Sequence, residues 1–165
     1  MSSTVVCLRF LHSVSSASPK SSSVHASLST SYSANTDCPC KKLCLRQNSI
    51  SSIELPESLA TTLQDLELYD NLISHIKGLD SFTELRSLDL SYNKIKHIKR
   101  VDHLKKLDHL YFVQNKISRI EGLDGLSNLT YLELGANRIR VSITHPRART
   151  NVNLQALRKF LAWKL

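Results

Sequence analysis

The sequence has little glycine or proline and no long apolar run. Among 165 residues there are 4 Gly and 4 Pro. No phosphate-binding glycine loop is present, and no Ser or Cys stands in a nucleophile motif such as G-x-S-x-G. No apolar stretch approaches the roughly 18 residues that a membrane span requires. These absences disfavour an enzyme, a bound cofactor, a small-molecule substrate and a transmembrane protein.

Cysteine is also scarce. Three of the 4 Cys stand in "CPCKKLC", Cys38 to Cys44, and no second Cys/His cluster follows at zinc-site spacing. No metal site is therefore expected. Because there is no disulfide framework either, a reducing intracellular compartment is the default expectation.

Acidic residues are missing from both ends of the chain. Residues 1–36 contain 13 Ser and no Asp or Glu, and residues 138–165 contain seven basic residues and no acid. Residues 41–137 hold 13 Lys+Arg against 13 Asp+Glu, so the basic excess belongs to the tail. A pI near 9.5 is thus weak support for nucleic-acid binding by the folded part.

A regular asparagine spacing dominates the middle of the chain. The five residues are separated by 23, 22, 22 and 22 positions: Asn48, Asn71, Asn93, Asn115 and Asn137. Full repeats begin at Leu63, Leu85 and Leu107, and each offers seven slots that are all apolar. This period with L-x-x-L-x-L-x-x-N is the signature of the leucine-rich repeat.

The pattern predicts an α/β fold, a right-handed leucine-rich-repeat solenoid of about 4–5 repeats of 22 residues. In L-x-L, both leucines point inward because side chains alternate along a strand, and x lines the concave face. Each Asn stands where the chain leaves the strand, where its amide can satisfy backbone groups that the turn leaves without partners. A structural role is expected for all five asparagines.

The x positions predict one column on the concave face. Its expected members are Cys44, Glu67, Asp89, Tyr111 and Glu133, and Tyr69 and Tyr131 should lie beside it. Carboxylates stacked in register repel one another, and exposed aromatic side chains often anchor interfaces. We therefore expect an acidic, tyrosine-bearing surface that binds a protein with basic side chains.

Several phrases resemble a known family of proteins. "LCLRQN", "FVQNKISRIEGL" and "LELGANRIR", within residues 43–140, are similar to the leucine-rich-repeat regulatory subunit of protein phosphatase 1 (the regulatory subunit 7 family), apparently in a truncated form. The resemblance implies non-catalytic binding of the phosphatase catalytic subunit by the concave face. It also implies contacts at Asp89, Tyr111 and Glu133, with Glu67 in the equivalent slot, and a location in the nucleus and cytoplasm.

The two ends lie outside this pattern. Residues 1–39 are expected to be a disordered Ser-rich segment, with an organelle-targeting peptide as the alternative. Repeats are expected over 40–141 and a basic tail over 142–165. Leu154, Leu157, Leu161 and Leu165 share one helical face, so residues 153–165 are predicted to form a helix that covers the end of the solenoid.

Two other functions fit the same sequence. The repeats could serve as an adaptor for a cytoskeletal or ciliary protein, and the basic tail could make the chain an RNA-associated scaffold. A steep loss of binding with salt would indicate phosphate contacts, whereas dependence on Glu67, Asp89 and Glu133 would indicate a basic protein surface.

Overall fold

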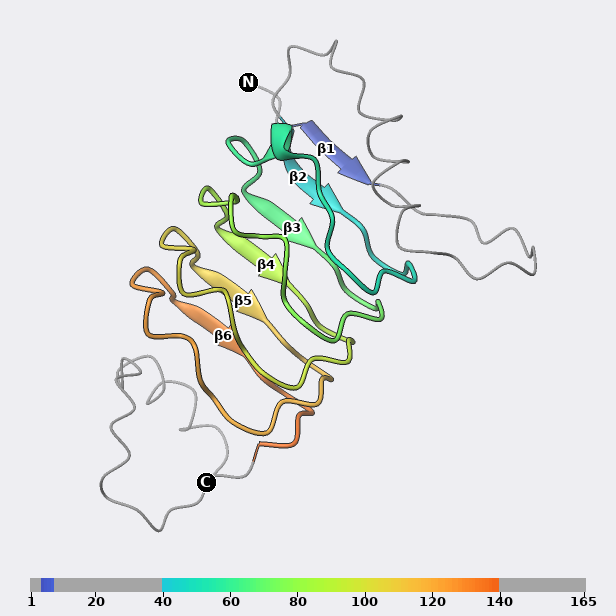
Figure 1. The fold of residues 1–165 in the computed structure, drawn as a ribbon, viewed down its shortest axis with the longest axis vertical. Helices are drawn as coiled ribbons and strands as arrows, with labels where there is room; N and C mark the ends of the chain where they lie inside the picture. Colours follow the sequence, from blue (N-terminus) through green and yellow to red (C-terminus); the bar gives the residue numbers. More distant parts are fainter. Residues whose placement is uncertain (1–3, 8–39, 140–165) are drawn as a thin grey trace, which may run out of the picture.

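The computed structural model describes residues 4–7 and 40–139, which form a solenoid around one parallel sheet (Figure 1). The strands follow the order of the chain: β1 Thr4–Cys7, β2 Cys40–Cys44, β3 Asp65–Glu67, β4 Ser87–Asp89, β5 His109–Tyr111 and β6 Tyr131–Glu133. Each coil adds one strand beside the previous one, so residues one repeat apart become neighbours in space.

The strands alternate as the L-x-L pattern predicts. Leu66, Leu88, Leu110 and Leu132 are in register on successive strands and are all buried, while the residues on either side of each are at least partly exposed. Because the side chains alternate, one face of the sheet lines the core and the other meets solvent.

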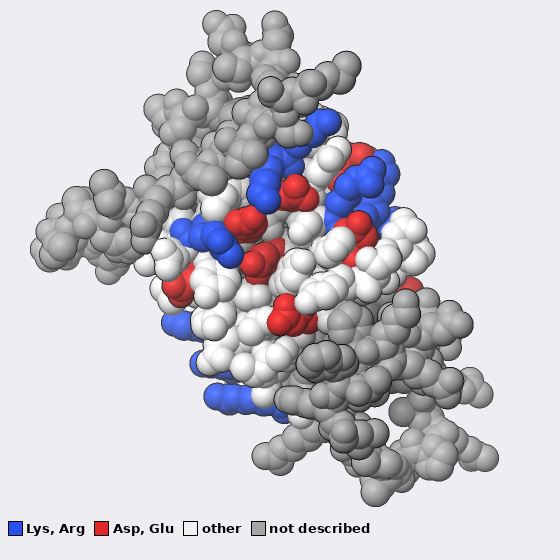
Figure 2. All heavy atoms as spheres, turned by 180° about the vertical axis from the view of Figure 1, so that it is seen from behind, with Lys and Arg blue, Asp and Glu red and all other residues white. Residues whose placement is uncertain are grey.

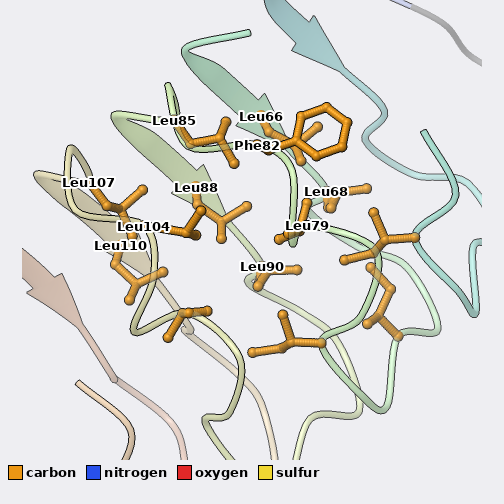
Figure 3. Close-up of a cluster of buried hydrophobic side chains, with 14 of the residues drawn as sticks. Leu66, Leu68, Leu79, Phe82, Leu85, Leu88, Leu90, Leu104, Leu107 and Leu110 are labelled. Atoms are coloured by element: carbon orange, nitrogen blue, oxygen red, sulfur yellow. The ribbon is translucent and has the colours of Figure 1, made fainter. Parts of the chain in front are cut away.

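The apolar slots of the three full repeats form the core (Figure 3). Of the predicted slots only Ile120 is not buried, and it still packs against the core. The slots of the second repeat, Leu85 to Leu104, are all 0 % exposed because coils cover them on both sides. The predicted leucine-rich-repeat solenoid is confirmed.

The side opposite the sheet consists of turns. In the part of the chain that the structure describes, the one helical element there is a 3-10 turn, η1, at Glu57–Leu59. Each full repeat has 22 residues, of which three form the strand. The chain returns to the next strand through short turns, whose apolar residues, such as Leu79 and Phe82, point into the core.

The N-terminal segment differs in one place from the expectation of disorder over 1–39. Thr4–Cys7 forms β1, which pairs in parallel with β2 and aligns Val6 with Leu43. This pairing occupies backbone groups of β2 that would otherwise form an open sheet edge. The other residues of 1–39 lie outside the described residues, as do the basic tail 142–165 and its predicted helix.

Each coil turns at a left-handed residue that the sequence did not reveal. The residue before each of the five repeat asparagines has a φ between 53° and 56°: Gln47, Asp70, Tyr92, Gln114 and Ala136. None is a glycine, although this conformation normally costs an L-residue free energy. Seven residues after Asn71, Gly78 also has a positive φ of 74°.

Candidate protein-binding face

The outward strand residues form one continuous column. Strand pairing aligns Cys44 with Glu67, Glu67 with Asp89, Asp89 with Tyr111 and Tyr111 with Glu133. All five side chains are half-buried, because neighbours in the column and in the two flanking columns crowd them. The structure thus brings the predicted Glu67, Asp89, Tyr111 and Glu133 together on one face.

The column is not uniformly acidic. Tyr111 separates Asp89 from Glu133, and Glu67 pairs with two cations of its own chain. The Lys42 Nζ lies 3.1 Å from one Glu67 carboxylate oxygen, and the Arg46 Nε lies 3.4 Å from the other. Figure 2 shows basic and acidic side chains intermixed at the end of the molecule nearest β2.

The pairing of Glu67 changes its ionisation. Burial alone would raise the pKa of Glu67, but hydrogen bonds from Lys42 and Cys44 and the charges of Lys42 and Arg46 outweigh it. The pKa of Glu67 is therefore below its ordinary value, and the hydrogen bond to Glu67 raises the pKa of Lys42. Glu67 is therefore an ionised carboxylate whose charge is already compensated by Lys42 and Arg46.

Asp89 occupies the centre of the column and also holds the end of its strand. One Asp89 carboxylate oxygen accepts a hydrogen bond from the backbone N–H of Ser91 at 2.9 Å. Ser91 itself is buried, and its hydroxyl accepts a hydrogen bond from the Val113 N–H at 3.2 Å. The second carboxylate oxygen of Asp89 can then face a partner while the side chain is held in place.

An aromatic cluster occupies the C-terminal half of the face. The ring centroids of Tyr111 and Tyr131 lie 5.2 Å apart, and the ring of His109 lies 5.8 Å from that of Tyr131. The Tyr131 hydroxyl donates a hydrogen bond to Glu133 at 3.5 Å. Burial raises the pKa of Tyr111, and the nearby Tyr131, Asp89 and Glu133 raise it further.

A second aromatic pair lies at the ends of the strands, and sequence reasoning found only half of it. Tyr69, which the L-x-L pattern placed on this face, has its ring centroid 4.7 Å from that of Tyr92. The Arg46 guanidinium lies 4.8 Å above the Tyr69 ring. Tyr92 is 43 % exposed and has a left-handed backbone. The leucine pattern predicts neither this conformation nor the contact of Tyr92 with Tyr69.

The asparagines link consecutive coils. The Asn93 amide donates to the carbonyls of Leu68 and Leu90 at 3.0 and 3.1 Å, and its oxygen accepts from the Ile73 N–H at 2.9 Å. Asn71, Asn115 and Asn137 make the equivalent bonds to both coils. Asn48 donates to Leu45 and Arg46 in its own coil.

Within residues 40–139, no three His, Cys, Asp or Glu side chains are grouped so that they could hold a metal ion. His75 and His97 are exposed on the outer turns, and His97 lies 3.2 Å from Glu121. No helix in the described residues is long and apolar enough to cross a membrane.

The fold and its column define the class of protein: the chain is a leucine-rich-repeat solenoid with an acidic and aromatic concave face. The sequence model described as Leucine Rich Repeat matches residues 84–104. An internalin (inlF) from Listeria monocytogenes has a similar structure, with a TM-score of 0.50 and 26 % identity over 62 % of this chain and 37 % of that one.

One curated relative is similar in sequence over a short stretch. The chain is 53 % identical over 45 residues to "Protein phosphatase 1 regulatory subunit SDS22" of Schizosaccharomyces pombe. The match spans 27 % of this chain and 13 % of that protein. The resemblance to regulatory subunits of protein phosphatase 1 is thereby confirmed for this stretch.

Proposed function

We propose that this chain is a non-catalytic regulatory subunit that binds the catalytic subunit of protein phosphatase 1 through its concave face. The observation that carries the proposal is the column of Asp89, Tyr111 and Glu133, aligned on three adjacent strands beside Tyr131. The similarity to a phosphatase regulatory subunit supports the identity of the partner. A nuclear and cytoplasmic location belongs to the same proposal.

The C-terminal half of the face would make the main contacts. Asp89 and Glu133 have no basic partner among the described residues, in contrast to Glu67. The two tyrosines between and beside them offer flat, partly exposed rings with hydroxyl groups. Carboxylates that flank aromatic rings suit lysine and arginine side chains, through ion pairs and cation–π contacts. Tyr69 and the paired Glu67 would contribute at the margin.

Affinity capture of the catalytic subunit tests the proposal. We expect Asp89→Lys combined with Glu133→Lys to abolish capture from cell extract, because both changes place like charges against a basic surface. The matched control is Asp80→Lys combined with Asp124→Lys, which makes the same charge change at exposed turn positions away from the strands. Equal capture by both variants and the unchanged chain would refute the proposal. Capture of a cytoskeletal or ciliary protein instead would support the adaptor function.

A further inference from the structure

The nearly neutral repeat body separates its charges in space. The turn segments that follow four of the asparagines, residues 71–78, 93–100, 115–122 and 137–139, contain eight Lys or Arg and one Asp or Glu. The rest of 40–139 contains six Lys or Arg and twelve Asp or Glu. A charge count along the chain hides this division, because every repeat contributes to both regions.

The basic residues of these turns lie along one edge of the solenoid, here called the basic edge. All eight are exposed: Lys77, Lys94, Lys96, Lys99, Arg100, Lys116, Arg119 and Arg138. Figure 2 shows Lys and Arg following one another down the left margin of the molecule, the side toward which the strands point. The one acidic residue of the edge, Glu121, lies beside His97.

Three of these cations form a column that continues from an exposed leucine in the coil before them. The backbone N–H groups of Lys94, Lys116 and Arg138 donate hydrogen bonds to the carbonyls of Ile73, Ile95 and Ile117 in the preceding coils, at 2.8, 2.9 and 2.9 Å. Leu72 bonds in the same way to Ile50 at 2.8 Å. The four residues therefore occupy one position in successive coils, about 4.8 Å apart near the sheet.

These cations have no carboxylate of their own. None of the eight forms an ion pair with another described residue, whereas Lys42, Arg46 and Lys106 elsewhere in the repeats do. Stacking like charges at this spacing is unfavourable unless a partner compensates them. Leu72 is 42 % exposed, one of few large apolar side chains on the surface of the described residues.

We propose that the basic edge binds an acidic polypeptide segment that carries an aliphatic residue at one end of its acidic run. The acidic side chains pair with Lys94, Lys116 and Arg138, and the aliphatic residue packs on Leu72. A nucleic acid fits this edge less well, because it offers no aliphatic side chain for Leu72, and the turn segments contain no Phe, Tyr or Trp on which a base could stack. The site is separate from the concave face.

The experiment measures fluorescence anisotropy of a labelled oligoglutamate peptide that ends in leucine, with the full chain as receptor. Lys94→Glu combined with Lys116→Glu should weaken binding about tenfold or more, since it sets like charges against the peptide. Lys94→Gln with Lys116→Gln should give an intermediate loss, and serves if the reversed variant does not fold. The control Lys41→Glu with Arg86→Glu changes net charge equally outside the edge and should retain most of the affinity.

Leu72→Ala tests whether the ligand is a peptide with an aliphatic residue or a polyanion such as a nucleic acid. It should weaken the binding of the leucine-bearing peptide and leave the binding of a leucine-free oligoglutamate unchanged. Equal loss in the edge and control variants would overturn the proposal, because binding would then follow net charge alone. It would also be overturned if labelled oligouridylate bound the edge as tightly as the peptide and Leu72→Ala affected neither probe. Phosphatase capture by the edge variants reports on the concave face separately.

Discussion

Lys42 on β2 lies 3.1 Å from Glu67 on β3, so the first carboxylate of the concave column is neutralised within the chain. Arg46 approaches the other oxygen of Glu67 and also covers the Tyr69 ring. The acidic character available to a partner is therefore concentrated at Asp89 and Glu133. Under the proposed function, Asp89 and Glu133 would contact the partner, whereas Glu67 would stabilise the coil.

The Glu67 cluster should make stability depend on pH. The pKa of Glu67 is lower in the folded chain than in the unfolded chain, so its ion pairs stabilise the fold above the ordinary glutamate pKa. This contribution disappears as the pH falls through the lowered pKa. We expect Glu67→Gln to reduce the free energy of unfolding at neutral pH and to flatten its decline in acid, as measured by urea denaturation across pH.

Glu57→Gln is the control for that titration. Glu57 is an exposed glutamate of the 3-10 turn, outside the cluster. Its removal should leave the acid decline as in the unchanged chain. If Glu67→Gln and the unchanged chain lost stability in parallel on acidification, the ion pairs would not contribute to the fold.

Core truncation should distinguish the two faces of the coil. Leu90 is 0 % exposed, and Leu90→Ala should lower the free energy of unfolding by about 2–5 kcal/mol because it opens a cavity. Leu72→Ala removes the same atoms from a side chain that is 42 % exposed and should change stability by about 0.5 kcal/mol or less. Equal unfolding midpoints for the two variants would contradict the orientation of the leucines.

The asparagine side chains that link consecutive coils should contribute to stability as much as core residues do. Asn93→Ala leaves the buried Ile73 N–H without its acceptor. It also removes one of the two amide donors of the Leu68 and Leu90 carbonyls, which keep their bonds from Asn71 and Asn115. We expect a loss of about 2 kcal/mol or more, since one buried N–H would remain unpaired and two further buried hydrogen bonds would be lost. Asn128→Ala removes one exposed bond, to the Lys105 carbonyl at 2.8 Å, and should cost less than about 1 kcal/mol. Thermal or chemical unfolding of both variants compares them.

A glycine at the outer turn should resist substitution. Gly78 has φ +74°, and a Cβ there would overlap the carbonyl oxygen of Ile53 in the preceding coil. Gly78→Ala should therefore destabilise the chain by about 2–3 kcal/mol. Gly135 has open space around it, so Gly135→Ala should change stability by about 0.5 kcal/mol or less. A well-tolerated Gly78→Ala would show that adjacent coils can separate at this turn.

Much of the fold could be predicted because the repeat acts locally. A position such as Leu88 or Ile95 is buried in the same way in every coil, and its neighbours in space follow from the 22-residue period itself. The Thr4–Cys7 strand could not be predicted, because it depends on a distant edge of β2 rather than on a pattern of its own. Tyr92 was missed since the leucine lattice does not determine the direction of a left-handed residue.

The sequence by itself determined the coil, the core and the column that contains Asp89, Tyr111 and Glu133, because a strict period fixes which side chains stack. Only the tertiary structure decided how charges in that stack are shared. Lys42 and Arg46 are far from Glu67 along the chain but adjacent across strands, and Lys94, Lys116 and Arg138 form a column only once the coils are stacked. Electrostatic interaction depends on distance in space, which the order of residues does not give.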